Sequence, residues 1–238
     1  DGLLWYSFIL KNKLSVIGAQ AYRIANQSIA DHVFACLNNN LHLRVTFFSS
    51  GAAYDAPDLH EYEQDPYAYL KNQYERELSK YCTMLTVYPY ATLGKYISNQ
   101  HSFAASSFLY QAISTGVISI ESKSPVVRSY GSVHDFSRLL IRLYEINDWL
   151  GNSIPTKIVP VTHTLDLFQL ANEVSSSLSK SIAIVSKIEP NALPSVYVAS
   201  DYSYGGHLSR FGVNPTSLRD QLLDMASGSA FKFAPNTR

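Results

Sequence analysis

Two side chains that could act together in proton transfer lie on one short segment of the chain. Tyr67 precedes Lys71 by four positions, so on a helix the phenol and the ammonium share one face. A cation near a phenol favours the phenolate and lowers the pKa of the tyrosine, which suits Tyr67 to acid–base work near neutral pH. Among the seventeen tyrosines, Tyr67 alone has a lysine four residues later. The spacing by itself is also what a surface tyrosine beside a surface lysine would give.

A serine upstream of this pair provides the structural context. Residues 43–48, LRVTFF, are rich in β-branched and aromatic side chains and predict a buried strand that ends at Ser49-Ser50-Gly51. A serine just past the carboxyl end of a strand lies where open α/β sheets place their ligands. The Ser50 hydroxyl could donate to a substrate oxygen as charge develops there. The order strand, serine, loop and Tyr–Lys helix therefore predicts a catalytic triad of Ser50, Tyr67 and Lys71, rather than an ordinary loop serine.

The elements that must position these residues alternate between strands and helices. The residue patterns predict strands over 43–48, 83–88, 182–185 and 195–199, and helices over 28–37, 66–80, 102–115 and 165–178. Asp135 is predicted to cap a further helix, and Thr216 or Ser217 to cap a last one. This alternation predicts an α/β fold with a mainly parallel sheet.

Composition narrows the classes of partner and compartment. The chain has 238 residues, with 19 basic and 19 acidic ones and no basic block, which argues against nucleic acid as a partner. Its longest uncharged stretch, residues 96–120, is too polar for a membrane span, and residues 1–10 lack a targeting signal. Cys36 and Cys82 form neither a disulfide framework nor a metal motif, so a reducing, cytoplasmic setting is expected.

Five segments, in this order, resemble the extended short-chain dehydrogenase/reductase family, the nucleotide-sugar epimerase/dehydratase group. They are Asn26, Phe48-Ser-Ser-Gly-Ala-Ala-Tyr54, Pro66-Tyr-Ala-Tyr-Leu-Lys71, Arg128-Ser-Tyr-Gly-Ser-Val-His-Asp135 and Gly212-Val-Asn-Pro-Thr-Ser-Leu218. The resemblance covers about residues 26–225. It implies a Rossmann-type doubly wound parallel sheet with a small C-terminal α/β substrate lobe.

The resemblance also implies roles for individual residues. Tyr67 would move a proton on or off a sugar hydroxyl, Lys71 would hold the nicotinamide ribose, and Ser50 would orient the sugar oxygen. Ser49 and Asn26 would join Tyr67 and Lys71 in binding NAD or NADP. Substrate contacts would come from Ser50, from Arg128 at the diphosphate of a nucleotide sugar, and from His101 and Ser107, for which a surface cluster is the alternative. Relatives that pair through the Tyr–Lys helix suggest a homodimer by analogy.

Several departures from the family pattern narrow the prediction. No Gly-x-Gly-x-x-Gly occurs, and residues 1–25 are too short for the first βαβ unit, which lies outside this chain or has been lost. We therefore expect an incomplete catalytic core over 1–125 with substrate-lobe insertions, and a core return with the substrate lobe over 126–238. Gly51-Ala52 stand where dehydratases carry an acidic pair, while Tyr88 and Ala91 stand where the family often has Arg and Asn.

The sequence therefore predicts an NAD(P)-dependent nucleotide-sugar epimerase or ketoreductase. The alternatives are a sugar-nucleotide 4,6-dehydratase and a catalytically silent family member that acts as a binding or scaffold protein. Two other histidine clusters have simpler explanations. His60 lies in an acidic loop with Glu61, Glu63 and Asp65 that is expected to be solvated rather than to bind a metal, and His134 beside Asp135 marks a helix start rather than a proton relay.

Overall fold

The protein folds into two compact units that are interleaved along the sequence. In this computed structural model the described residues are 2–40, 42–58, 61–96, 101, 103–146, 154–178 and 181–228. The first unit comprises Asp1–Pro89 with Leu143–Val159, and the second comprises Tyr90–Arg142 with Pro160–Arg238. The expected division at residue 125 assumed two continuous stretches, whereas a strand from the later half of the chain returns to the first sheet. The assignment of a catalytic role to the first part of the chain and a substrate-binding role to the second stays a prediction.

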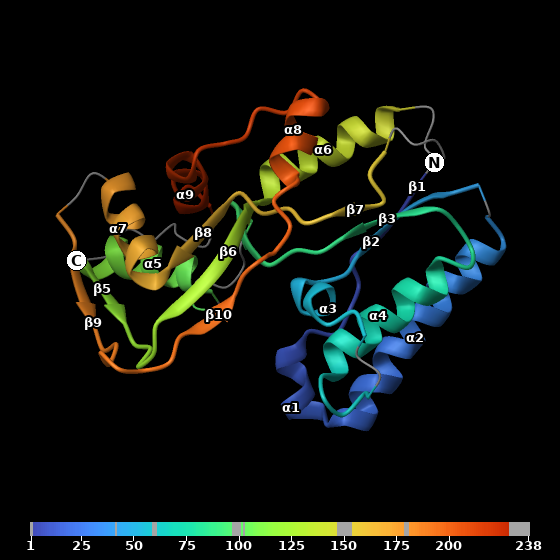
Figure 1. Cartoon of the computed structure of the whole chain (residues 1–238), viewed down its shortest axis with the longest axis horizontal. Helices are drawn as coiled ribbons and strands as arrows, with labels where there is room; N and C mark the ends of the chain where they lie inside the picture. Colours follow the sequence, from blue (N-terminus) through green and yellow to red (C-terminus); the bar gives the residue numbers. More distant parts are fainter. Residues whose placement is uncertain are drawn as a thin grey trace, which may run out of the picture. The chain divides into compact units, whose positions relative to one another are not determined.

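The first unit is built on a four-stranded sheet in which every pairing is parallel. Its strand order is β1 (Gly2–Trp5), β2 (Arg44–Phe48), β3 (Met84–Val87) and β7 (Lys157–Ile158). The helices are η1 (Lys11–Lys13), α1 (Leu14–Ile17), α2 (Ala19–Asn38), α3 (Gly51–Asp55) and α4 (Pro66–Leu78). Because β2 and α4 fall where the sequence predicts them, Ser50 and the Tyr–Lys pair are carried by the expected elements. The long helices α2 and α4 run side by side (Figure 1).

Helices α2 and α4 cover one face of this sheet through an aromatic core. The Trp5 ring of β1 lies 5.0 Å from the Phe47 ring of β2 and 5.6 Å from the Tyr74 ring of α4. The strands β1 and β2 and the helix α4 therefore pack together around Trp5. Helix α2 begins nine residues before the predicted start at Ser28. The first half of α2 buries only Tyr22 and Asn26. Because Asn26 is polar, the apolar residues there do not repeat with the helical period, and the pattern misses this part of the helix.

The second unit contains the remaining elements. Its strands are β4 (Ala91–Leu93), β5 (Val117–Ile120), β6 (Val126–Ser132), β8 (His163–Asp166), β9 (Ala183–Ser186) and β10 (Ser195–Tyr197). Its helices are α5 (Ala104–Thr115), α6 (Val133–Glu145, whose last turn belongs to the first unit), α7 (Leu167–Ser177), α8 (Tyr204–Arg210) and α9 (Leu218–Ala226). Strands β10, β6 and β4 pair in parallel, β8 is antiparallel to β6, and β5 pairs with β9.

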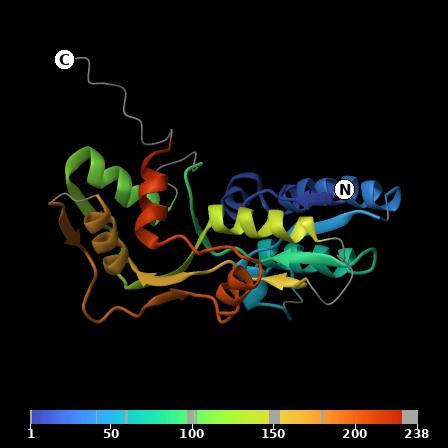
Figure 2. The ribbon, with the colours of Figure 1, turned by 90° about the horizontal axis from the view of Figure 1, so that it is seen from above.

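The core of the second unit lies where α5, α7 and α9 pack together (Figure 2). Leu109, Leu170 and Leu222 come from the three helices and are all fully buried. Helix α5 ends at Gly116 with φ 71°, the left-handed conformation that glycine adopts without a steric penalty, as its sequence predicts. No helix among the described residues is long and apolar enough to cross a membrane. The α/β fold with parallel sheets is confirmed.

Asp135 does not cap a helix, which corrects the sequence prediction. Helix α6 begins two residues earlier, and the Ser132 hydroxyl accepts from the Asp135 amide at 3.1 Å. The fully buried Asp135 carboxylate instead accepts from the Thr216 amide at 2.8 Å and from the Thr216 hydroxyl at 2.5 Å. Because Thr216 is used in this way, Ser217 alone caps α9, accepting from the Asp220 amide. A cap motif cannot reveal a partner 81 residues away.

Gly131 provides a stability test of the second unit. A Cβ at this position in β6 would overlap the carbonyl oxygen of Pro160, and backbone cannot yield as a flexible side chain can. Gly131→Ala is therefore expected to lower the free energy of unfolding by about 3 kcal/mol, measured by urea denaturation. Gly206→Ala in α8, where a Cβ meets nothing within 4 Å, is the control and should leave stability unchanged or raise it. Equal effects of the two changes would contradict this packing argument.

Candidate active site

The carboxyl end of β2 holds both serines of the predicted site. The Ser49 amide donates to the Val87 carbonyl at 2.8 Å, and the Gly51 amide donates to the Pro89 carbonyl at 2.9 Å, so the chain stays fastened to β3 as it leaves the sheet. Ser50 then caps α3, and its Oγ accepts from the Ala53 amide at 3.2 Å. Ser50 is only 5% exposed. The cap fixes the position of its hydroxyl at the edge where parallel sheets bind ligands.

The start of α4 fixes the predicted acid–base residue. The Asp65 carboxylate accepts from the amides of Tyr67 and Ala68 at 3.1 and 3.2 Å, and Pro66 occupies the first turn, where its missing N–H has no cost. Tyr67 therefore lies in the first turn of α4, and Lys71 follows one turn later. Lys11 pairs with Asp65 at 2.6 Å, which ties the segment after β1 to the same helix start.

Ser50 and Tyr67, predicted from separate motifs, are brought together. Burial raises the pKa of the Tyr67 phenol above its ordinary value, and a hydrogen bond with the Ser50 side chain acts in the opposite direction. The negative charge of Asp65 adds a smaller upward effect. The net direction is upward, so the phenol is protonated at neutral pH. The expectation that a nearby cation lowers the pKa of Tyr67 is wrong for this structure.

The position of the Lys71 ammonium explains that difference. Its Nζ donates to the carbonyl of Phe48, the last residue of β2, at 2.5 Å, and lies 5.9 Å from the centre of the Tyr67 ring. Lys71 is 3% exposed, and this burial lowers its pKa to about 7. The side chain is therefore only partly charged near neutral pH and is directed to the strand end rather than to the phenol.

Phe8 is a site residue that the sequence did not reveal. It lies just after β1, and its ring centre is 4.0 Å from Lys71 Nζ and 5.4 Å from the Tyr67 ring, edge to face. A second aromatic contact forms at the same edge, where Tyr6 stacks on Phe48 at 3.8 Å. These rings come together because β1 and β2 are parallel neighbours, a pairing that no local sequence pattern predicts. Phe8 therefore covers the ammonium and touches the acid–base residue.

The two predicted cofactor residues outside the triad differ in their hydrogen bonding. The Ser49 hydroxyl is buried and has no hydrogen-bond partner among the described residues. The Asn26 side chain is fully buried and engaged at both ends, because Oδ1 accepts from the Ile9 amide at 2.8 Å and Nδ2 donates to the Tyr22 carbonyl at 3.0 Å. Asn26 thus anchors the segment that carries Phe8, whereas Ser49 offers a free polar atom at the strand end.

The predicted substrate residues Arg128, His101 and Ser107 all lie in the second unit. The Arg128 guanidinium donates to the Ser195 carbonyl at 2.8 Å and to the Ser195 hydroxyl at 3.0 Å, so it now braces β6 against β10. The Ser107 hydroxyl accepts from the Gln111 side chain at 3.1 Å within α5. His101 is exposed, and its ring lies 4.8 Å from that of Tyr110. Their roles in substrate binding stay predictions.

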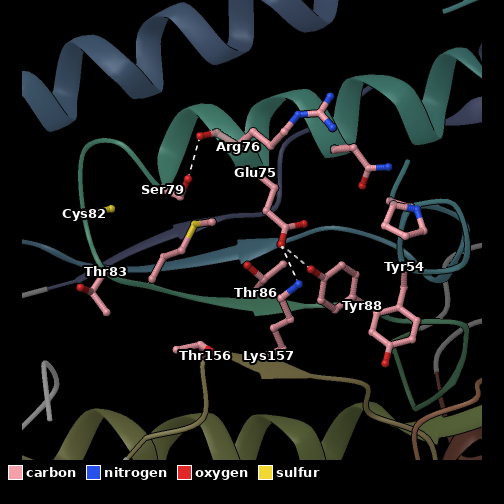
Figure 3. A pocket seen from close by; sticks show the side chains of 14 residues that line it. Tyr54, Glu75, Arg76, Ser79, Cys82, Thr83, Thr86, Tyr88, Thr156 and Lys157 are labelled. Atoms are coloured by element: carbon pink, nitrogen blue, oxygen red, sulfur yellow. Dashed lines mark hydrogen bonds and ion pairs between the residues drawn. The ribbon is translucent and has the colours of Figure 1, made fainter. Parts of the chain in front are cut away.

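A charged cluster between α4 and the end of β3 includes one of the departures from the family pattern. Tyr88 stands where the family often has arginine, and its hydroxyl donates to the Glu75 carboxylate in a very short hydrogen bond. Lys157, from β7, lies 3.7 Å from the same carboxylate (Figure 3). The positive charge beside Glu75 thus comes from Lys157 on β7 rather than from an arginine at position 88. His60, the centre of the acidic loop, lies outside the described residues, within which no group of three ligating side chains could hold a metal.

Comparison with known proteins identifies the fold. No protein-family model and no curated protein matches the sequence. Solved structures do match: UDP-glucose 4-epimerase of Bifidobacterium longum in complex with NAD+ and UDP (12% identity, TM-score 0.69, 98% of this chain and 78% of that one), and UDP-N-acetylglucosamine 4-epimerase of Methanobrevibacter ruminantium (19%, 0.67, 94% and 75%). A third is TunA, an NAD-dependent NDP-hexosamine 5,6-dehydratase of tunicamycin biosynthesis (13%, 0.66, 94% and 76%).

At these identities the likeness establishes the fold. The chain has the Rossmann-type fold of NAD-dependent nucleotide-sugar epimerases and dehydratases, and the resemblance drawn from its motifs is confirmed at that level. The roles of individual residues do not follow from it, because one fold supports many functions.

The buried lysine makes a prediction about stability and pH. Between its pKa of about 7 in the folded protein and its ordinary value of 10.5, the unfolded chain binds a proton that the folded chain does not. The free energy of unfolding should therefore rise with pH across this window. Lys71→Met removes this dependence, so the variant should be the more stable protein below pH 7, by on the order of 5 kcal/mol, and its advantage should shrink toward pH 10.

Urea denaturation at pH 6, 8 and 9.5 measures this difference. Lys80→Met, which removes an exposed lysine just after α4, is the matched control and should follow the wild-type profile. Parallel profiles for wild type and Lys71→Met would show that the ammonium is not buried in this way.

Proposed function

We propose that this protein is an NAD(P)-dependent nucleotide-sugar epimerase or ketoreductase in which Ser50, Tyr67 and Lys71 handle the proton that accompanies hydride transfer. The observation that carries the proposal is the closeness of the Ser50 and Tyr67 side chains, near enough for the serine to act on the pKa of the phenol. It joins two predicted residues at the carboxyl edge of a parallel sheet, where such folds bind ligands. Solved structures with this fold include epimerases of UDP-sugars, one of them in complex with NAD+ and UDP.

The nicotinamide end of a dinucleotide fits the residues present. The unpartnered, buried Ser49 hydroxyl supplies one polar group, and the Lys71 ammonium, with a single acceptor at Phe48, supplies another. In this proposal Lys71 holds the ribose and Asn26 acts by anchoring the Ile9 segment. NAD(P) supplies the hydride chemistry when bound. We assign no residue to its pyrophosphate, since the sequence has no Gly-x-Gly-x-x-Gly.

The protonation state of the site favours one direction of proton transfer. Because burial raises the pKa of Tyr67, its phenol begins protonated and can donate to an oxygen that gains negative charge, as a ketone does on reduction. The Ser50 hydroxyl lies beside that phenol and can hold the same oxygen. An epimerase needs the reverse transfer first, and for that step a more fully charged Lys71 would have to approach the phenol.

Arg128 is assigned to the diphosphate of the nucleotide sugar, with His101 and Ser107 as further substrate contacts. Its present acceptors, two on Ser195 and the Val127 carbonyl, are all uncharged. A diphosphate would replace them with charged oxygens, which a guanidinium fork binds more strongly.

One observation supports a second candidate, a silent binding protein. Phe8 covers Lys71 at 4.0 Å, so a cofactor ribose reaches the ammonium only after this ring moves. A 4,6-dehydratase is less well supported, because Gly51 and Ala52 replace the acidic pair expected there.

Tyr67→Phe tests the proposed chemistry. Removing the phenol hydroxyl should lower kcat by at least about 100-fold, the low end for losing a general acid–base group. Turnover is measured with NAD(P)(H) and a panel of UDP-, dTDP-, GDP- and CDP-sugars. Tyr69→Phe, two residues away on α4, is the matched control and should retain activity. If Tyr67→Phe and wild type turn over a panel member equally well, the triad assignment is wrong.

Phe8→Ala separates the enzyme from the silent protein. In the enzyme, removal of the ring exposes Lys71 and should tighten NADH or NADPH binding by roughly tenfold, a gain of about 1.4 kcal/mol, seen by fluorescence titration. Phe34→Ala removes a ring that packs on Trp5 away from Lys71 and controls for general loosening. Failure of both wild type and Phe8→Ala to bind either cofactor would favour the silent protein.

A further inference from the structure

A cavity beside the C-terminal half of α4, beyond Lys71 along the helix, is not used by the proposed reaction. This cavity of about 740 Å³ belongs wholly to the first unit, and its volume falls in the range usual for small-molecule sites. Asn72, Glu75 and Arg76 of α4 form one wall, and Lys157 of β7 lies on the facing one (Figure 3). Tyr54 of α3 closes one end, while Cys82 and Thr83 lie at the other.

The floor of the cavity is one face of β3. Met84, Thr86 and Tyr88 alternate along the chain and all line the hollow, as side chains on one face of a strand do. Tyr88 and Tyr54 meet edge to face with ring centres 5.0 Å apart. A flat ring could therefore lie against this aromatic corner.

The charges in the cavity favour an anion. Glu75, the one carboxylate among the described lining residues, is 16% exposed and already accepts from Tyr88 and pairs with Lys157 at 3.7 Å. Lys157 is 60% exposed and keeps donors for a ligand. Within the described part of the chain no carboxylate pairs with Arg76. One cation is thus left over, and its planar fork suits a phosphate or a carboxylate.

We propose that this cavity is a binding site for a small aromatic anion. The ligand's ring packs on Tyr54 and Tyr88, and its phosphate or carboxylate group binds Arg76 and Lys157. The site is separate from Ser50, Tyr67 and Lys71, and it does not depend on the proposed enzymatic activity.

The position of the cavity connects it to the candidate active site. Tyr54 lies in α3, whose N-cap is Ser50, and the Asn72 side chain donates to the Ala56 carbonyl at 2.6 Å, joining α4 to the end of α3. A ligand here touches both elements that carry the triad. Ligand binding would therefore affect Ser50 through α3 and Tyr67 through α4.

Binding is tested with phenyl phosphate and benzoate, which distinguish the two anionic groups, and with phenol and inorganic phosphate as partial ligands. Calorimetry on the purified protein should show that at least one aromatic anion binds, and more tightly than phenol or phosphate. Arg76→Ala and Lys157→Ala should each weaken it at least tenfold. Arg219→Ala, which removes an arginine of α9 in the second unit, is the matched control and should leave binding unchanged.

The aromatic corner gives a second readout. Tyr54→Ala, which removes one of its rings, should weaken binding at least tenfold. Phe34→Ala, which removes a ring that packs on Trp5 outside the cavity, should leave binding unchanged. Tyr67→Phe should bind normally even where turnover is lost, which separates this site from the proposed reaction. No binding of either anion, or binding unaffected by both Arg76→Ala and Lys157→Ala, would overturn the proposal.

Discussion

The contact on which the site depends is the one between the Lys71 ammonium and the Phe48 carbonyl, 2.5 Å long and almost fully buried. It joins the middle of α4 to the last residue of β2. The next residues, Ser49 and Ser50, leave the sheet from this fixed point, and Tyr67 lies one turn earlier on the same helix. A single hydrogen bond from a lysine thus sets the distance between the two halves of the candidate site. It also removes the ammonium from water, which lowers its pKa.

Helix α4 contributes side chains to the core, to the candidate active site and to the cavity wall, because its residues face different surroundings. Tyr74 and Leu78 are fully buried against β1, β2 and α2. One turn toward the N-terminus, Tyr67 and Lys71 reach the carboxyl edge of the sheet. Glu75 and Arg76 face the cavity beside β3. The aromatic core around Trp5 fixes the rotation of the helix about its axis. A change in that core would therefore alter both the proton-transfer residues and the cavity wall.

The sequence predicts correctly the features that depend on neighbouring residues and misses those that depend on residues far apart in the chain. Strand β2 and helix α4 depend on neighbouring residues and were predicted correctly, and Ser217 was one of the two residues predicted to cap α9. Asp135 was misassigned because its partner Thr216 is 81 residues away. Phe8 was missed for a similar reason: its contact with Lys71 exists only because β1 pairs beside β2. The direction of the pKa shift at Tyr67 was wrong since spacing on a helix shows which side chains are neighbours, and does not show where an ammonium points.

The burial of Lys71 itself bears on whether the site is active. A methionine or leucine would fill the same space among Phe8, Phe47 and Tyr67 without the penalty of removing a charge from water. The Phe48 carbonyl is already at a strand end where water or a backbone amide could satisfy it. The lysine thus lowers stability at neutral pH, and what it provides in return is the hydrogen bond that positions the candidate site. Local arrangements that reduce stability concentrate at functional sites. The buried ammonium therefore argues for a site that uses it, with Phe8 as the group that must move first.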